Sequence, residues 1–331
     1  MVHGATVRES QPTPASWRSS VNRVLCWALV GALLPGVATA ADVFEKVGTY
    51  AAQFLKIGVS ARATAMGSAF TAVADDASSA YWNPAGLTAV DGTVVSLNHT
   101  EWPADINLEY ANYTFSPGFI QGKVSLHARG LTMDPQVVRT IYRQQGTGEM
   151  FDAGDMSFGL SYARYFTDKF SAGATLSWMH MGLADRSVNS FVFDFGLLYR
   201  IGIRGMKLGM AVQNIGSQVN FDQRDSKLPT IFKVGVSLDA YRNGPHSMLV
   251  VGEFSHPSDN KEHQNFGLEY SFNNFVFLRS GYNVNYDSEA FAAGAGVALR
   301  TSQSTSIDAD YSFVDMGALG GVHRVSLGFT Y

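Results

Sequence analysis

The stretch FVFDFGLLYRI, residues 191–201, alternates between two kinds of side chain. Every odd-numbered position is apolar or aromatic, from Phe191 to Ile201, whereas the even-numbered positions include Asp194, Gly196 and Arg200. Successive side chains of a β-strand point to opposite faces, so this pattern predicts a strand with one apolar face and one mixed face.

The same period of two recurs along the chain from about residue 93, and the last segment ends on Phe329 and Tyr331. We predict fourteen strands, at 93–98, 107–115, 122–130, 157–166, 170–182, 190–201, 206–214, 230–240, 247–255, 264–272, 275–282, 291–300, 304–313 and 323–331. Most have about the nine to eleven residues that a tilted strand needs to cross a bilayer. An aromatic residue at the end of the last strand is usual in outer-membrane barrels.

With these boundaries, short and long connections between strands alternate along the chain. Each short connection has fewer residues than any of the long ones. Transmembrane barrels have an even number of strands, short periplasmic turns and longer outer loops. Closure is also required in lipid, because an open sheet edge leaves backbone groups unpaired. The sequence therefore predicts an all-β protein, a 14-stranded antiparallel transmembrane β-barrel in the outer membrane with both termini periplasmic. A secreted β-sandwich or propeller is the soluble alternative, but it has no reason to segregate its loop lengths.

Composition excludes several other classes of protein. The 331 residues include 24 Lys and Arg against 28 Asp and Glu, so no basic excess exists to bind nucleic acid. A chain with 46% hydrophobic and 16% charged residues is not intrinsically disordered. The lone cysteine, Cys26, excludes a disulfide scaffold and a thiolate metal site.

The first forty residues have the pattern of a secretory signal peptide. Arg18 and Arg23 precede the apolar stretch 24–38, and the small residues that follow predict cleavage between Ala40 and Ala41. The alternative is an anchoring helix, which Pro35-Gly36 would interrupt. An exported chain with no cysteine after this site is typical of a Gram-negative envelope.

Residues 41–92 do not alternate and are rich in Ala, Gly and Ser. Ser60 and Asp76 are candidate caps of two short helices, and Asn83-Pro84 ends the second. We predict a partly helical hatch (41–92) inside the lumen of the barrel (93–331). The turn Asn83, Pro84, Ala85 and Gly86 would form its fixed corner. Tyr81, Trp82 and Leu87 would pack that corner against the inner wall near the periplasmic rim.

The segment from Phe54 to Leu87, FLKIGVSARATAMGSAFTAVADDASSAYWNPAGL, closely resembles the signature of the PorV/PorQ family. That family lies within the FadL-like outer-membrane proteins, which share an N-terminal NPA turn, here Asn83-Pro84-Ala85. Further similar blocks are 146–164, 211–216 and 228–237. The resemblance implies a fourteen-stranded barrel with a hatch.

Charged residues at inward positions of the predicted strands should face the lumen, because such groups are costly in lipid. They are Asp194, Arg200, Lys207, Glu253, Glu269, Arg300, Asp308, Asp310 and Arg324. They form either a structural network between hatch and wall, which we favour, or a path for solutes. Asp75 and Asp76 would meet Arg200, Arg300 or Arg324, unless Asp76 only caps its helix.

No catalytic motif is present, so we predict a protein that is not an enzyme and has no cofactor or metal. His256 and His263 share a predicted loop with Asp259 and Glu262, for which a solvated loop is favoured over a metal site. Two functions remain. The resemblance implies a PorV-like accessory of type IX secretion, with secreted cargo proteins or a translocon as partners. The alternative is a FadL-like passive conduit for hydrophobic small molecules, which enter from outside and leave laterally or through a gap in the hatch.

Overall fold

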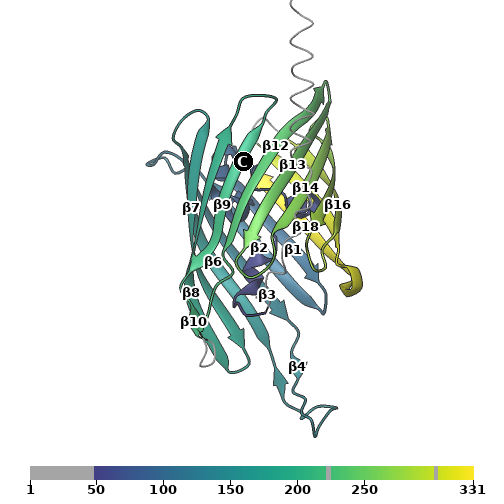
Figure 1. Ribbon diagram of the computed structural model, residues 1–331. Helices are drawn as coiled ribbons and strands as arrows, with labels where there is room; N and C mark the ends of the chain where they lie inside the picture. The colour runs from purple at the N-terminus through teal and green to yellow at the C-terminus, as the bar shows by residue number, and fades with distance from the viewer. Residues whose placement is uncertain (1–47, 221–224, 302–304) are drawn as a thin grey trace, which may run out of the picture. The chain divides into compact units, whose positions relative to one another are not determined.

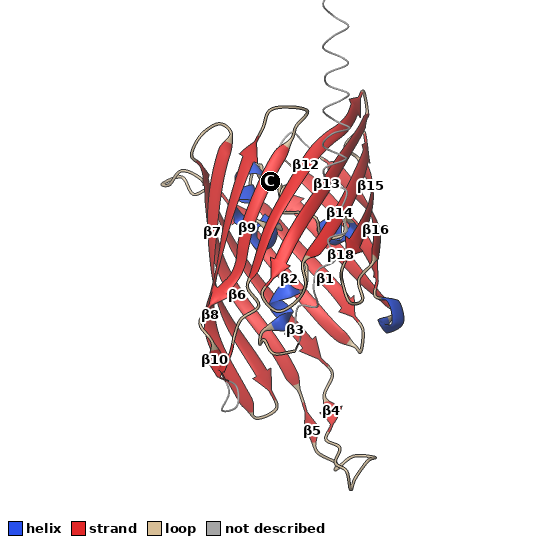
Figure 2. Cartoon of the chain, viewed as in Figure 1, coloured by secondary structure: helices blue, strands red, loops and turns tan. Residues whose placement is uncertain are grey.

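The computed structural model describes residues 48–220, 225–301 and 305–331. Within them the chain forms a closed antiparallel barrel of fourteen strands with an N-terminal segment inside it (Figures 1 and 2). The predicted signal peptide and its cleavage site between Ala40 and Ala41 lie outside the described residues, as does 41–47 of the predicted hatch.

Each barrel strand pairs with the next barrel strand along the chain, and β1 closes the barrel against β18. The barrel strands are β1 (Val94–Trp102), β2 (Ile106–Phe115), β3 (Lys123–Met133), β6 (Ala153–Tyr165), β7 (Phe170–Leu183), β8 (Arg186–Arg200), β9 (Lys207–Gly216), β12 (Ile231–Asn243), β13 (His246–Pro257), β14 (His263–Phe272), β15 (Val276–Val284), β16 (Phe291–Arg300), β17 (Ser306–Asp315) and β18 (Gly321–Thr330). Two small hairpins lie outside the barrel: β4 (Gln136–Val137) with β5 (Met150–Phe151), and β10 (Val219–Asn220) with β11 (Asp225–Ser226).

The predicted fourteen-stranded antiparallel barrel is confirmed, but the strict segregation of connection lengths is wrong. The turns 103–105 and 184–185 are short, although both lie at the end where every connection is predicted to be long. The cause is that the strands run further than predicted: β7 and β8 stay paired up to Leu183 and Arg186. The long connections 134–152 and 217–230 do lie at this end, which we name the loop end. The opposite end, where β1 begins and β18 finishes, is the turn end.

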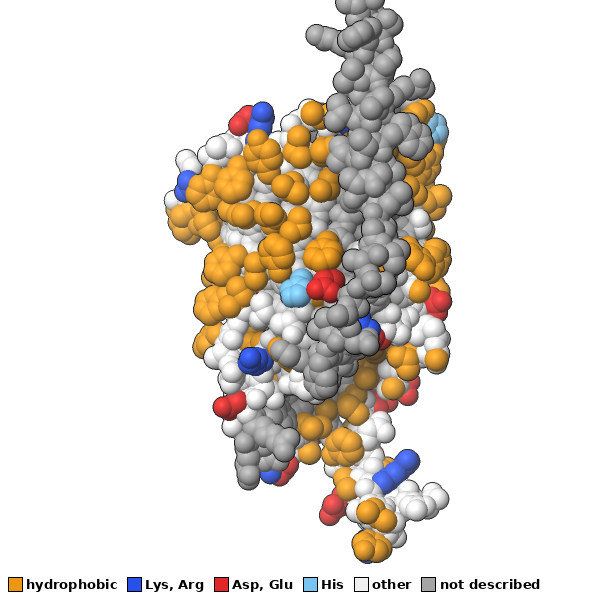
Figure 3. Space-filling model, viewed as in Figure 1, with side chains coloured by type: hydrophobic (Ala, Val, Ile, Leu, Met, Phe, Trp, Pro, Cys, Tyr) orange, Lys and Arg blue, Asp and Glu red, His pale blue; other side chains and the backbone are white. Residues whose placement is uncertain are grey.

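The alternation of the sequence appears as an exposed apolar exterior. Phe191, Phe195 and Leu197 are 57%, 51% and 41% exposed, whereas the intervening Gly196 and Leu198 are buried. Figure 3 shows hydrophobic side chains gathered over the outer face of the barrel, with charged side chains mostly toward its two ends. An exterior of this kind is unfavourable in water. Large exposed apolar patches are therefore typical of a face that contacts a membrane or another protein.

The segment before β1 packs inside the barrel and is here called the hatch, residues 48–93. Its short helices are η1 (Gln53–Lys56), α2 (Ala61–Ala65), α3 (Ser79–Trp82) and η2 (Pro84–Ala89), and a further one, η3 (Gly317–Leu319), joins β17 to β18. In the part of the chain that the structure describes, no helix combines the length and apolarity required to span a membrane.

Ser60 is not the side-chain cap that the sequence predicts for α2. It has a φ of 71°, and its hydroxyl makes no capping bond. The N–H of Ala61 donates instead to Ser326 Oγ of β18 at 2.7 Å. The barrel wall thus supplies the acceptor that an isolated helix would take from its own N-cap residue.

The hatch can approach the wall closely because the wall is lined with glycine. A Cβ on Gly196 would fall on the side chain of Asn83, and one on Gly281 would fall on the backbone of Gly67. Other wall glycines stand in the same relation to the hatch: Gly173, Gly209, Gly267 and Gly294. At these glycines the hatch lies so close to the wall that a side chain on the wall would overlap it.

Candidate functional site

The Asn83-Pro84-Ala85-Gly86 turn links the hatch to the wall. The Asn83 side chain is fully buried; its Nδ2 donates to Thr71 O at 2.8 Å and to Leu197 O of β8 at 3.0 Å. Its Oδ1 accepts from the N–H of Ala85 at 3.1 Å, at the start of η2. Every hydrogen-bonding group of this amide is thus used, either within the hatch or on the barrel.

The three aromatic and apolar residues predicted to pack this corner divide between two places. Leu87 lies against Ala163 of β6 and near Val94, toward the turn end. Trp82 instead packs in the core of the hatch against Phe70, and its Nε1 donates to Val59 O at 3.0 Å. Tyr81 stacks edge-on against Trp82 and donates to Leu55 O at 3.2 Å. Only Leu87 therefore occupies the rim position that the sequence suggested.

An ion network joins the hatch to the wall through Arg62. Its guanidinium binds Asp75 at 2.7 Å, Asp76 at 3.2 Å and Glu269 of β14 at 2.9 Å. Glu269 also accepts from Arg279 of β15 at 2.6 Å. Arg279 in turn binds Asp310 of β17 at 2.5 Å.

Asp75 and Asp76 form their ion pairs with other residues than Arg200, Arg300 or Arg324, so these expected partners were wrong, whereas the alternative of Asp76 as a cap of its helix agrees with its bonds to Ser78. Asp75 pairs with Arg62 and Lys207, and Asp76 also accepts from the N–H of Ser78 at 2.9 Å, just before α3. Burial tends to raise the pKa of Asp75, but Arg62 and Lys207 outweigh it and lower that pKa to about 2. Burial raises the pKa of Asp76.

The remaining charges at inward positions fall into different surroundings. Glu253 accepts from the N–H of Thr71 in the hatch at 2.9 Å, and Asp194 accepts from the N–H of Asn214 at 2.6 Å, where the β8–β9 register shifts. Asp308 accepts from Ser306. Arg200 lies over the ring of Tyr165, and Arg300 is exposed at the end of β16.

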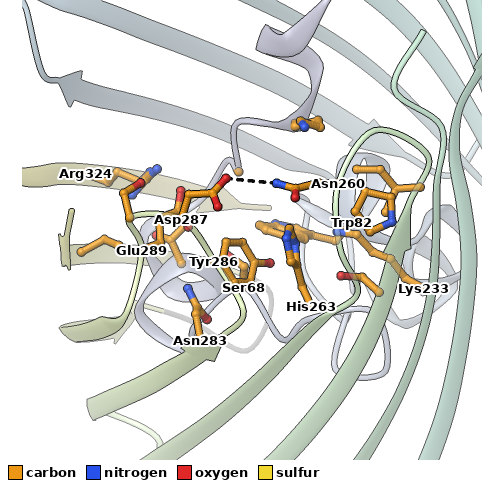
Figure 4. A pocket seen from close by; sticks show the side chains of 18 residues that line it. Ser68, Trp82, Lys233, Asn260, His263, Asn283, Tyr286, Asp287, Glu289 and Arg324 are labelled. Carbon is orange, nitrogen blue, oxygen red and sulfur yellow. Dashed lines mark hydrogen bonds between the residues drawn. The ribbon is translucent and has the colours of Figure 1, made fainter. Parts of the chain in front are cut away.

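Two cavities lie between the hatch and the loop end. The first, which we name the polar cavity, has a volume of about 210 Å³. Figure 4 shows Arg324, Glu289 and Asp287 on one side of it and Trp82 and Lys233 on the other, with His263 and Tyr286 between them. His263 is stacked on Tyr286, with 3.9 Å between ring centroids, and Lys233 lies 4.8 Å from the ring centroid of Trp82.

The second, which we name the apolar cavity, has a volume of about 560 Å³. Most of its lining is hydrophobic: Tyr50, Ala51, Ala52, Phe54 and Ile57 of the hatch, with Trp102, Leu131 and Met181 of the wall. Lys56 and Glu289 line both cavities, so the two spaces adjoin.

The sequence analysis identified Arg324 and Trp82 but missed most of this site. Trp102 and Leu131 lie beyond the predicted ends of their strands, at 98 and 130, and Met181 lies near the end of a predicted strand, where the distinction between lumen and exterior depends on register. Tyr286, Asp287 and Glu289 lie in the connection after β15, where no period exists to assign them a direction. The only available signal is the concentration of polar and aromatic residues in 282–289.

The predicted loop histidines do not converge. His256 pairs with Glu262 at 3.1 Å at the surface, Asp259 pairs with Lys56 of the hatch at 2.8 Å, and His263 begins β14. Among the described residues, no cluster of three or more His, Cys, Asp and Glu side chains has an arrangement able to hold a metal ion.

Comparison of the sequence with protein families gives one match, to the uncharacterised protein family UPF0164, over residues 32–121. No curated protein sequence matches the chain.

Solved structures with the same fold include a hydrocarbon channel, a toluene transporter and a FadL homologue. The CymD monoaromatic hydrocarbon channel has a TM-score of 0.56 at 12% identity, over 82% of this chain and 96% of its own. The Ralstonia pickettii toluene transporter TbuX has a TM-score of 0.55 at 14% identity, over 83% and 97%. A Pseudomonas aeruginosa FadL homologue has a TM-score of 0.52 at 13% identity, over 82% and 96%. At these identities the similarity concerns the fold: the chain has the FadL-like fourteen-stranded barrel.

Proposed function

We propose that the protein is an outer-membrane conduit for small apolar molecules, which was the alternative reading of the sequence. The observation that carries this proposal is the apolar cavity of about 560 Å³ between the hatch and the loop end of the barrel. Apolar lining with few polar groups is typical of sites for small hydrophobic ligands. Two proteins of similar fold, a toluene transporter and a monoaromatic hydrocarbon channel, handle cargo of this class.

The exterior supports a membrane location for the barrel. Apolar side chains such as Phe191, Phe195 and Leu197 stand exposed on it, and the fourteen strands leave no free sheet edge. A closed barrel satisfies every ladder hydrogen bond within itself, which is the condition for crossing lipid. We place the turn end, where β1 begins and β18 finishes, in the periplasm, because outer-membrane barrels have their longer loops outside.

In this arrangement the cavities face the outside and the hatch lies beneath them. A hydrophobic molecule entering at the loop end would contact Trp102, Leu131 and Met181 of the wall together with the hatch residues that line the same cavity. The charged residues around Arg62 then act as structural bonds between hatch and wall, since each lies within 3.5 Å of an oppositely charged partner.

Uptake of radiolabelled toluene by a bacterial host that lacks its own hydrocarbon channels tests the proposal. Cells with the protein should take up toluene several-fold faster than cells without it. Leu131→Trp, which fills the apolar cavity, should remove most of this gain. Leu126→Trp on the outer face of the same strand is the matched control and should retain it. Equal uptake with and without the protein would refute the proposal.

A role as a PorV-like accessory of type IX secretion has one supporting observation. The β4–β5 hairpin extends from the loop end and carries Ile141 and Tyr142, which are 87% and 96% exposed (Figure 1). Backbone bonds between Thr140 and Arg143 hold this tip in a turn. Ordered, exposed apolar side chains favour contact with another protein. Pull-down of a type IX translocon or its cargo from the host, lost on Ile141→Ser with Tyr142→Ser, would support that role.

A further inference from the structure

The exterior of the barrel is interrupted by polar side chains where the sheet closes. His99 Nδ1 of β1 lies 2.6 Å from Glu109 Oε1 of β2, and the two side chains are 52% and 61% exposed. Glu101 of β1 and His323 of β18 are also exposed, and they are paired with each other across the closure of the barrel. We name these four residues the polar seam.

The polar seam lies on the outer face of the wall. On β1, Asn98 and Thr100 are only 6% and 2% exposed, because they point into the barrel. Successive side chains of a strand point to opposite faces, so His99 and Glu101 point outward. Leu97, on the same face of β1, is 48% exposed. The polar seam therefore occupies a surface that is apolar elsewhere on the barrel.

The polar seam shortens the apolar band of the wall. On β8 five successive outward positions are apolar, from Phe191 to Tyr199. On β1 and β2 only two and three such positions separate the turn end from the polar seam: Val95 and Leu97, and Ala111, Tyr113 and Phe115. Each outward position adds about 5 Å along the barrel axis, since a strand rises about 3.3 Å per residue and is tilted by about 40°. The band is thus about 25 Å high on β8, which is usual for such barrels, but about 10–15 Å on β1 and β2.

Tilting the whole barrel cannot remove this difference, because a tilt leaves the two parts of the wall with bands of unequal height. A band that is too short is accommodated by local thinning of the bilayer, at a small cost per ångström, or by association with another protein. A bilayer of full thickness would instead hold His99 and Glu109 in hydrocarbon, where ionisable groups are rare and expensive.

The bonding within the polar seam favours a thinner bilayer over a protein partner. His99 is bonded to Glu109, and His323 Nδ1 lies 2.7 Å from the hydroxyl of Tyr311. Water and lipid headgroups can satisfy the remaining positions of these side chains without any specific partner. The core of a protein interface is depleted of charged residues, whereas the centre of this surface is a His–Glu pair.

We propose that the polar seam thins the outer membrane locally, so that headgroups and water reach His99 and Glu109 on the outside of β18, β1 and β2. This part of the wall fits a bilayer with a thinner hydrocarbon core than the wall at β8 does. The inference goes beyond the proposed conduit and depends only on a barrel that crosses the membrane. The toluene assay therefore neither supports nor refutes it.

Refolding of the full-length protein into vesicles of two thicknesses tests the proposal. Dilauroyl phosphatidylcholine forms a thinner hydrocarbon core than dioleoyl phosphatidylcholine, and the measured quantity is the folded fraction in the first divided by that in the second. His99→Leu with Glu109→Leu extends the apolar band by one position on each strand. The ratio should therefore fall several-fold below that of the parent protein, because the thick bilayer no longer has to deform as far.

His256→Leu with Glu262→Leu is the matched control. This pair is 3.1 Å apart and 59% and 51% exposed, and it lies at the loop end of β13 and in the connection that follows. On β13 four apolar outward positions already separate it from the turn end, from Met248 to Phe254. The ratio of the control should thus stay close to that of the parent. Equal ratios for the two double variants would overturn the proposal.

A spin label gives a second readout that leaves the polar seam intact. Val325 pairs with His99 and is 46% exposed, and Phe195 on β8 is 51% exposed. Each is replaced by Cys in a Cys26→Ser chain, since Cys26 is the only cysteine, and labelled with a nitroxide. In dioleoyl phosphatidylcholine the label at 325 should be reached mainly by a water-soluble nickel chelate, and the label at 195 mainly by oxygen.

Oxygen as the main collider at both labels would overturn the proposal, because hydrocarbon would then cover the polar seam at full thickness. The same labels in native outer-membrane fragments test the protein alternative. A nitroxide at 325 that is shielded from both reagents there would show that a protein covers the polar seam, and this result would also overturn the proposal. Access of the nickel chelate in the fragments, as in the vesicles, is the expected result.

Discussion

The guanidinium of Arg62 binds the carboxylate of Glu269 through two hydrogen bonds, of 2.9 and 3.1 Å, and this pair joins the hatch to strand β14. Both side chains are largely buried, and both have further charged partners: Asp75 and Asp76 for Arg62, and Arg279 for Glu269. The hatch is therefore held by directed bonds as well as by apolar packing. Removing one member leaves buried carboxylates without their cation, which is strongly destabilising.

Arg62→Gln should loosen the hatch and let ions through the barrel. The expected cost to hatch docking is about 3–5 kcal/mol, the range for breaking a buried ion pair from one side. Single-channel recording in planar bilayers should show frequent openings that the parent protein lacks. The control is Arg242→Gln, since Arg242 is 72% exposed in its ion pair with Asp239 and should have little effect. Silent recordings from both variants would contradict the role given to Arg62.

Gly281→Ala should disturb the seat of the hatch. The new Cβ would overlap the backbone of Met66 and Gly67, which cannot move without displacing the whole segment. Thermal unfolding should begin at a lower temperature, consistent with a loss of about 1–3 kcal/mol for overpacking. Gly130→Ala, on β3, meets nothing within 4 Å and serves as the comparison. Equal melting of the two variants would mean that the hatch does not press on the wall at Gly281.

Phe195→Arg should impair insertion of the barrel into lipid. Phe195 is exposed on the outer face near the middle of β8, where an arginine costs about 2–4 kcal/mol at the bilayer midplane. Refolding into vesicles, titrated with urea, measures this cost. Phe119→Arg gives the control, because Phe119 is exposed in the connection between β2 and β3. If arginine is tolerated equally at both positions, the outer face of β8 does not contact lipid.

Acid should weaken hatch docking through Asp75. The pKa of this carboxyl is lowered to about 2, against about 3.9 in an unfolded chain, chiefly because Arg62 and Lys207 outweigh the effect of burial. Its ionised form therefore stabilises the docked hatch above about pH 4, and this contribution is lost as the pH falls from about 4 to 2. Conductance should rise over that window in the parent protein. Asp75→Asn should remove this component, and an unchanged acid response in that variant would exclude Asp75 as its source.

The sequence predicts the barrel well because its signal is local. In β8, the alternation of Phe191, Phe193, Phe195, Leu197 and Tyr199 requires only that the chain be extended with one face in an apolar medium. The same reasoning fails at the turn 184–185, since the polar residues of 186–190 carry no clear period. Strand ends are decided there by pairing between β7 and β8.

The contacts of the hatch cannot be predicted from the sequence, for a physical reason. Whether Asp75 meets Arg62, Arg200 or Arg324 depends on the position of each strand around the barrel axis. No local sequence pattern encodes that position. Ser60 has the right residue type for a cap, yet its positive φ and the nearby Ser326 give the role to the wall. The NPA turn was found because Asn83 and Pro84 act on their own neighbours.

The most direct test of the conduit is a crystal structure of the protein soaked with iodobenzene, an apolar aromatic whose iodine is located by anomalous scattering. The account predicts an anomalous peak in the apolar cavity, among Phe54, Trp102, Leu131 and Met181. Leu131→Trp should remove that peak and leave any peaks on the outer face unchanged. Iodine found only on the lipid-facing surface, with the cavity empty at saturating iodobenzene, would contradict the account.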